Sequence, residues 1–152
     1  MDWVTRKRPK TDRIACPWLI PRFIDPDATI HYVPPSDVFA EAQRRGDTSF
    51  DAPGADCTHT WTGTGDEERC TFEVLIDRHH LGGDPALAEL ARIVHAADIT
   101  GALDSQPLAA GLLAIGVGGL EIEKDDQILL EPSSFVYDAL YAHCHQQAGQ
   151  RP

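Results

Sequence analysis

The chain lacks any long hydrophobic run. No stretch of its 152 residues approaches the roughly 18 consecutive apolar residues that indicate a membrane-spanning helix. The N-terminus, MDWVTRKRPK, carries basic residues but not the apolar segment that follows them in a secretory signal. We therefore expect a soluble cytoplasmic protein that does not associate with membranes.

Cysteine is also scarce, and the four cysteines form neither a CxxC pair nor a dense framework. In a cytosolic protein of this size such cysteines are free thiols rather than disulfides. Cys16 precedes Pro17 near the start of a predicted helix and follows Arg13 closely. It is therefore either a thiolate or oxyanion site stabilised by positive charge, or a small buried core residue.

Positive charge is limited to one part of the chain. The net charge is −11, so we expect this domain alone not to bind nucleic acid, which requires a basic surface. Residues 1–22, however, hold six basic residues against two acidic ones. This segment either pairs with the acidic remainder or forms an anion site, with Arg6, Arg13 and Arg22 as the candidate oxyanion ligands.

Several motifs of nucleotide and acyl chemistry are missing. The chain has no GxxxxGK[ST] segment, so it has no phosphate-binding P-loop. The glycines of residues 116–119 follow a predicted helix, whereas a dinucleotide-binding fingerprint follows a strand. No GxSxG segment is present either. The sequence thus predicts no nucleotide cofactor.

The remaining pattern predicts a single domain over residues 1–152, of the α/β or α+β class. It shows no internal repeat and no linker, and its second half has helical periodicity. A short sheet near the N-terminus is expected from strands at 2–5, 28–33 and 48–51, with helices at 12–26 and 37–45. Pro21 lies inside the first of these helices and should end, kink or restart it. The second helix of this part has Ser36 as its cap and ends at Gly46.

The glycine-rich residues 52–69 are expected to form the longest loop. In the helical half, Asp84 and Pro85 are typical of an N-cap followed by the first helical residue. A further helix is expected over 107–115, ended by the glycines of 116–119. A last helix should begin at Ser133 or Ser134.

An unusual acidic stripe occurs between residues 70 and 80. If this segment is a helix, the side chains of Cys70, Glu73, Asp77 and His80 fall within an arc of about 80°, with apolar residues on both flanks. If it is a strand, the two acids simply point outward. The glycines that follow favour the helix.

A second anomaly is Asp98, which falls within the apolar face of the helix that begins at Pro85. A buried carboxylate must be capped, paired or bound to a metal, because burying an unpaired charge costs several kcal/mol. His59 lies in the glycine-rich loop, which can fold over both of these helices. The sequence thus predicts one Fe, Mn or Zn ion held by His59, Glu73 and Asp98, with Cys70 near it. The alternative is a hydrogen-bonded network that only fixes helix packing.

Four segments together are similar to one known family. They are WVTRKRPKTDRIACPWLIPRFID, CTFEVL, DPALAELARIVHAAD and YDALY. They resemble the C-terminal domain of the ChrB-type chromate resistance proteins, from Trp3 to about Tyr141, with DRIACPWLI as the most specific part. In longer members this domain follows an N-terminal regulatory region or a rhodanese-like domain. The resemblance implies a link to sensing chromate and controlling the genes for its efflux.

This chain departs from the family pattern at two places. Pro21 stands where the family usually has arginine, so Arg22 remains as the one candidate anion ligand there. His95 and Ala96 stand where arginine and glycine are common, which disfavours His95 as a shared ligand. The predicted metal ligands match the pattern.

Three functions follow from these observations. The first is an accessory or sensor of chromate resistance that binds a metal ion, an oxyanion or both. The second is a small metal-dependent detoxifying or redox enzyme, which would require an open coordination position beside a pocket. The third is a non-catalytic interaction domain whose polar cluster is structural. No oligomeric state is assigned.

Overall fold

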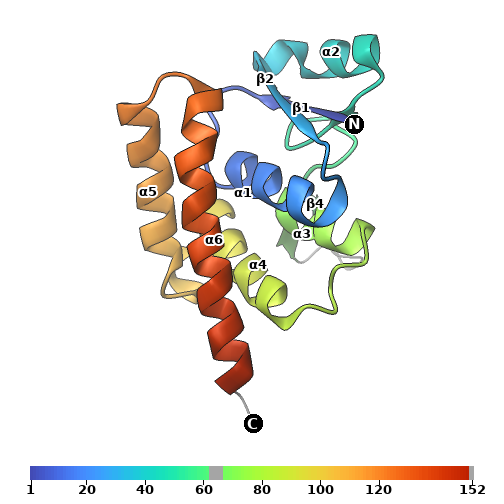
Figure 1. The fold of residues 1–152 in the computed structure, drawn as a ribbon. Coiled ribbons are helices and arrows are strands. Elements are labelled where there is room, and N and C mark those ends of the chain that lie inside the picture. The colour runs from blue at the N-terminus through green and yellow to red at the C-terminus, as the bar shows by residue number, and fades with distance from the viewer. Residues whose placement is uncertain (62–66, 151–152) are drawn as a thin grey trace.

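The computed structural model describes residues 1–61 and 67–150. It confirms the predicted fold class, a small α/β domain with a helical second half (Figure 1). The elements, in chain order, are β1 (Asp2–Arg6), α1 (Asp12–Leu19), a π-helical turn (Ile20–Ile24), β2 (Thr29–Val33), a 3₁₀ turn (Pro35–Asp37), α2 (Val38–Arg45), β3 (Thr48–Ser49), β4 (Thr60–Trp61), β5 (Glu68–Arg69), α3 (Thr71–Arg78), α4 (Pro85–Asp98), a second 3₁₀ turn (Leu103–Ser105), α5 (Ala109–Ile122) and α6 (Asp126–Gln150).

The main sheet has three parallel strands in the order β2-β1-β3. Its central strand β1 pairs Trp3 with Ile30 on one side and with Thr48 on the other. Parallel strands require crossover connections, which α1 and α2 supply here. Trp3, Val4 and Thr5 are all buried, so β1 forms the centre of this layer.

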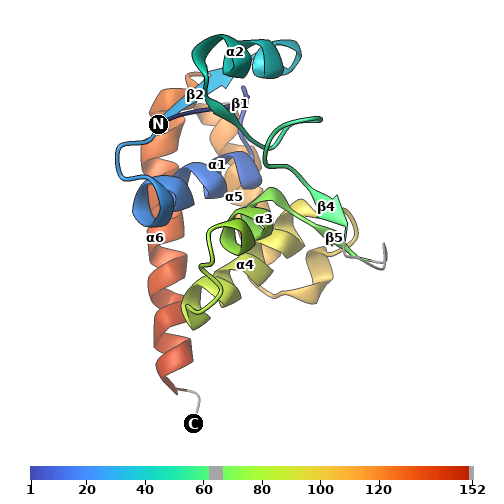
Figure 2. The ribbon, with the colours of Figure 1, turned by 90° about the vertical axis from the view of Figure 1, so that its right-hand side faces the viewer.

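Helix α1 is the buried centre of the molecule. Figures 1 and 2 show it between the sheet and helices α3 and α4, with α6 along one side. Trp18 of α1 is fully buried and its ring lies against Phe72 of α3 and Tyr137 of α6. Its indole Nε1 donates a hydrogen bond of 2.7 Å to Asp138 of α6. These contacts hold α1 against α3 and α6.

The predicted end of α5 and the predicted beginning of α6 were both wrong. Helix α5 continues through the glycines of 116–119 to Ile122. Although glycine weakens a helix by about 1 kcal/mol, a Cβ at Gly119 would lie 3.2 Å from Leu129 Cδ1, so glycine permits this close approach of α5 and α6. Helix α6 begins at Asp126 rather than at Ser133 or Ser134. Asp125 provides the cap instead, because its Oδ1 accepts the N–H groups of 127 and 128.

The helix expected over 12–26 changes near Pro21, as predicted, because its α-helical part ends at Leu19 and a π-helical turn follows. The start of the next helix differs from the expected one. Ser36 does not cap α2, because its hydroxyl donates to the side chain of Asp37, whereas Gly46 ends α2 with a φ of 74° as expected. The segment after Cys70 forms helix α3, which confirms the helix expected between residues 70 and 80 rather than the strand.

The long loop expected over 52–69 contains two short strands at its end. Strands β4 and β5 pair antiparallel, Thr60 with Arg69 and Trp61 with Glu68. The loop glycines Gly63 and Gly65 belong to residues 62–66, which lie outside the described residues. Among the residues that the structure describes, none of the helices combines the length and apolar character needed to span a bilayer.

Candidate functional site

The imidazole of His59 lies among several carboxylates. His59 Nε2 is 3.1 Å from Asp98 Oδ2, 3.4 Å from Asp12 Oδ2 and 3.5 Å from Asp51 Oδ1. On the other side of the ring, Nδ1 lies 3.0 Å from Glu68 Oε1. Ligand atoms of Asp12, His59 and Asp98 all lie within 4.8 Å of one another. We call these three residues the His59 cluster.

The ends of helices bring the His59 cluster together. Asp12 is the first residue of α1, and Asp98 is the last residue of α4. The side chain of Asp12 is only 1% exposed, and its oxygens accept the backbone N–H groups of Thr71, at 2.6 Å, and Phe72, at 3.3 Å. The start of α3 thus holds this carboxylate in one orientation beside His59.

The His59 cluster holds a proton strongly. Hydrogen bonds to Asp12 and Asp98 raise the pKa of His59 to about 11, against the opposing effect of partial burial. Burial raises the pKa of Asp12 to about 7, although the bond to His59 opposes this shift. Both directions place more protons on the folded cluster than on the same groups in water. A cation can take the place of such a proton among carboxylates.

A second group of possible ligands lies at the start of α3. Glu73 Oε2 accepts the backbone N–H of Cys70 at 2.9 Å and lies 2.8 Å from His95 Nδ1 on α4. Ligand atoms of Cys70, Glu73 and His95 lie within 4.8 Å of one another, and we call these residues the Cys70 cluster. Burial holds the pKa of the Cys70 thiol well above its usual range.

The predicted metal ligands are therefore divided between two neighbouring clusters. His59 and Asp98 come together as expected, whereas Glu73 and Cys70 lie with His95, which the family pattern disfavoured as a ligand. The clusters adjoin, because Thr71, whose N–H binds Asp12, directly follows Cys70. Asp12 was not among the expected ligands. An acid in the first turn of a helix is ordinary, so the sequence carries no signal that singles it out.

Two of the three candidate oxyanion ligands also come together. Arg6 Nη2 and Arg13 Nε lie 3.3 Å and 3.2 Å from the same oxygen of Asp51. Arg22 lies elsewhere, with its Nε 2.9 Å from Asp138 and its guanidinium over the ring of Trp18. The structure thus pairs Arg6 with Arg13 and separates Arg22 from both.

Cys16 is fully buried within the hydrophobic core. Burial holds the pKa of its thiol well above the usual range, and the nearby carboxylates act in the same direction. This environment favours the core residue over the stabilised thiolate.

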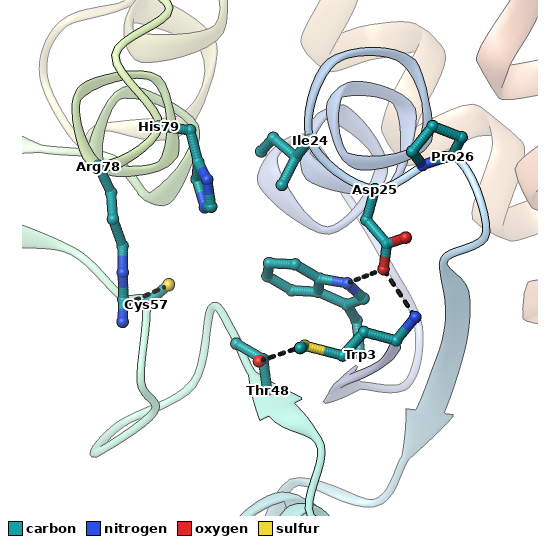
Figure 3. Close-up of a pocket in the computed structure, with 9 residues that line it drawn as sticks. Trp3, Ile24, Asp25, Pro26, Thr48, Cys57, Arg78 and His79 are labelled. Carbon is teal, nitrogen blue, oxygen red and sulfur yellow. Dashed lines mark hydrogen bonds and ion pairs between the residues drawn. The ribbon is translucent and has the colours of Figure 1, made fainter.

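A cavity of about 470 Å³ lies at the other end of the sheet and contains none of the predicted site residues (Figure 3). Its polar groups contact one another. Asp25 accepts a hydrogen bond from the indole of Trp3 and forms an ion pair with the amino group of Met1. Across the cavity, Arg78 Nη1 lies 2.9 Å from Cys57 Sγ.

Comparison with known proteins agrees with the resemblance seen in the sequence. The family model described as the C-terminal domain of ChrB matches residues 3–144. Protein ChrB of Cupriavidus metallidurans is 36% identical over 147 residues, which make up 93% of this chain and 40% of that relative. The chain thus spans less than half of the relative's length, and no solved structure matches it. The chain belongs to the family of ChrB C-terminal domains.

Proposed function

We propose that this domain serves chromate resistance, as an accessory or a sensor, by binding a divalent transition metal ion in the His59 cluster. Membership of the ChrB C-terminal domain family supports the link to chromate. The geometry of the cluster supports the metal ion.

The observation that carries the metal site is the convergence of carboxylates on one imidazole nitrogen. Asp12 and Asp98 have side chains only 1% and 15% exposed, and both point an oxygen at His59 Nε2. Carboxylates so close together repel each other, and a cation removes that repulsion. One nitrogen and two oxygens form a donor set that suits Fe, Mn or Zn.

A further contact resembles the surroundings of known metal-binding histidines. Such a histidine almost always hydrogen-bonds a carboxylate, a carbonyl or a water through its second ring nitrogen, which fixes the tautomer and the ring orientation. Here Glu68 is placed to accept a hydrogen bond from His59 Nδ1 at 3.0 Å. The Nε2 atom would then face the carboxylates of Asp12 and Asp98 as a metal ligand.

Metal content tests this proposal. The protein should be produced with Fe, Mn and Zn available, purified without tag or chelator, and subjected to elemental analysis. We expect Asp98→Asn to hold about one equivalent less metal than the wild type, while Asp104→Asn, at an exposed position, holds as much as the wild type. Wild-type protein with well under one equivalent, or an Asp98→Asn variant that loses none, would leave the cluster as a structural network.

Oxyanion binding is a second candidate function, favoured by the paired guanidinium groups of Arg6 and Arg13. Two guanidinium groups on one carboxylate present N–H donors that match an oxyanion. Asp51 holds both of them and also lies 3.5 Å from His59. The anion site would therefore adjoin the metal site.

Calorimetric titration with chromate and with sulfate tests this candidate. We expect weak binding heat that Arg13→Ala abolishes and that Arg22→Ala retains, because Arg22 lies apart on Asp138. If all three proteins titrate alike, the paired arginines are not the anion site.

A further inference from the structure

The Cys70 cluster contains donor atoms that the His59 cluster does not. Its thiol precedes the first turn of α3, its carboxylate belongs to that turn, and its imidazole lies in the last turn of α4. These three donors lie within 4.8 Å of one another. We propose that Cys70, Glu73 and His95 form a second metal site, which binds a thiophilic divalent ion such as Zn²⁺.

The donor set decides the class of ion. Thiolate and imidazole ligands select zinc and similar ions, whereas carboxylate oxygens suit harder ions such as manganese. The His59 cluster offers one nitrogen and otherwise oxygens, while the Cys70 cluster offers sulfur, nitrogen and oxygen. The two clusters share no residue, so this inference does not depend on metal binding by the His59 cluster.

The hydrogen bonds of Glu73 indicate the position of the proposed ion. Glu73 Oε2 accepts the N–H of Cys70 and lies 2.8 Å from His95 Nδ1. A hydrogen bond of this length holds one proton between the carboxylate and the imidazole, and a cation bound by both groups replaces that proton. The backbone bond to Cys70 keeps the carboxylate next to the thiol. Coordination then deprotonates the thiol, as it does in structural and catalytic zinc sites.

Three protein ligands leave one position of a tetrahedral ion open, as in catalytic zinc sites. Glu73 and His95 line a cavity of about 540 Å³ whose other lining residues include Arg92 and Gln106. Cys70 is buried behind them. The open position therefore faces this cavity, where water or a small anion beside Arg92 completes the coordination.

Titration with Co²⁺ tests the second site, because cobalt bound to a thiolate shows a sulfur-to-metal charge-transfer band in the near ultraviolet. An oxygen and nitrogen site such as the His59 cluster gives no such band. We expect the band in the metal-free wild type on addition of Co²⁺, and we expect Cys70→Ser to abolish it. Serine is a good N-cap, so this variant should keep α3 intact, which circular dichroism checks.

The other variants separate this site from the first. Cys57→Ser is the matched thiol control and should keep the band, since Cys57 contacts Arg78 elsewhere. Asp98→Asn should also keep it, whatever happens to the first metal ion. His95→Gln should weaken the apparent affinity for Co²⁺ at least about tenfold. The absence of the band in the wild type, its survival in folded Cys70→Ser, or an unchanged affinity in His95→Gln would overturn the second site.

Discussion

At the scale of single residues, the imidazole of His59 has carboxylates at both of its ring nitrogens. Its two ring nitrogens contact Asp98 and Glu68, and Asp12 lies 3.4 Å away. Hydrogen bonds to Asp12 and Asp98 raise its pKa from 6.5 to about 11. In the absence of metal, the protonated imidazole thus takes the position of the cation.

This shift makes the stability of the metal-free protein depend on pH. Because the folded pKa of His59 lies above the unfolded value, its contribution is complete below pH 6.5 and is lost as the pH rises toward about 11. We expect the free energy of unfolding of chelator-treated protein, measured with urea, to fall between about pH 7 and pH 9. The His59→Gln variant should show a smaller fall, and the exposed His143→Gln should behave like the wild type. Equal slopes for all three would contradict the assignment.

Only those site residues that interrupt a local sequence pattern could be predicted from the sequence. Asp98 stood out because a carboxylate interrupts an apolar helix face, and the structure places it on His59. Glu73 lies elsewhere because its carboxylate accepts the N–H of Cys70 and binds His95. Asp12 carries no local signal, since only its contact with Thr71 across the fold distinguishes it.

At the scale of elements, the helices and strands with local signals were predicted well. The β-branched residues of β2 and the Asp84 cap of α4 appear where they were expected. The end of α5 was missed, because the contact of Gly119 with α6 is tertiary and no sequence window contains it. Strands β4 and β5 were missed because two residues are too short to show a period.

The Asp84 cap gives a prediction for α4. Its Oδ1 accepts the N–H groups of Ala86 and Leu87, and its Oδ2 accepts the hydroxyl of Tyr141. We expect Asp84→Ala to lower the free energy of unfolding by about 1–2 kcal/mol in urea denaturation. Asp84→Asn keeps a capping acceptor and should lose less. An alanine variant as stable as the wild type would show that the cap contributes little.

At the scale of the whole molecule, the net negative charge of the chain affects which ions can approach the proposed sites. The proposed metal site adjoins the pair Arg6 and Arg13, in a chain whose net charge is −11. Small cations are attracted by such a charge, whereas anions must approach against it except near these arginines.

The same net charge predicts how the domain behaves toward DNA. Binding to DNA depends on releasing counterions from phosphates with basic groups, and the acidic residues here outnumber the basic ones by 24 to 13. We expect no specific gel shift at physiological salt with promoter DNA from its own operon. A salt-tolerant, sequence-specific shift at nanomolar protein would show that this expectation is wrong.

The proposed metal ion lies between Asp12, His59 and Asp98. An anomalous difference map of crystals grown with Mn²⁺ tests it most directly, because it locates the ion itself. We expect a peak within coordination distance of His59 Nε2 and of oxygens of both aspartates. A map without a peak at that position, with His59 still bonded directly to Asp98, would show that these residues do not hold a metal ion.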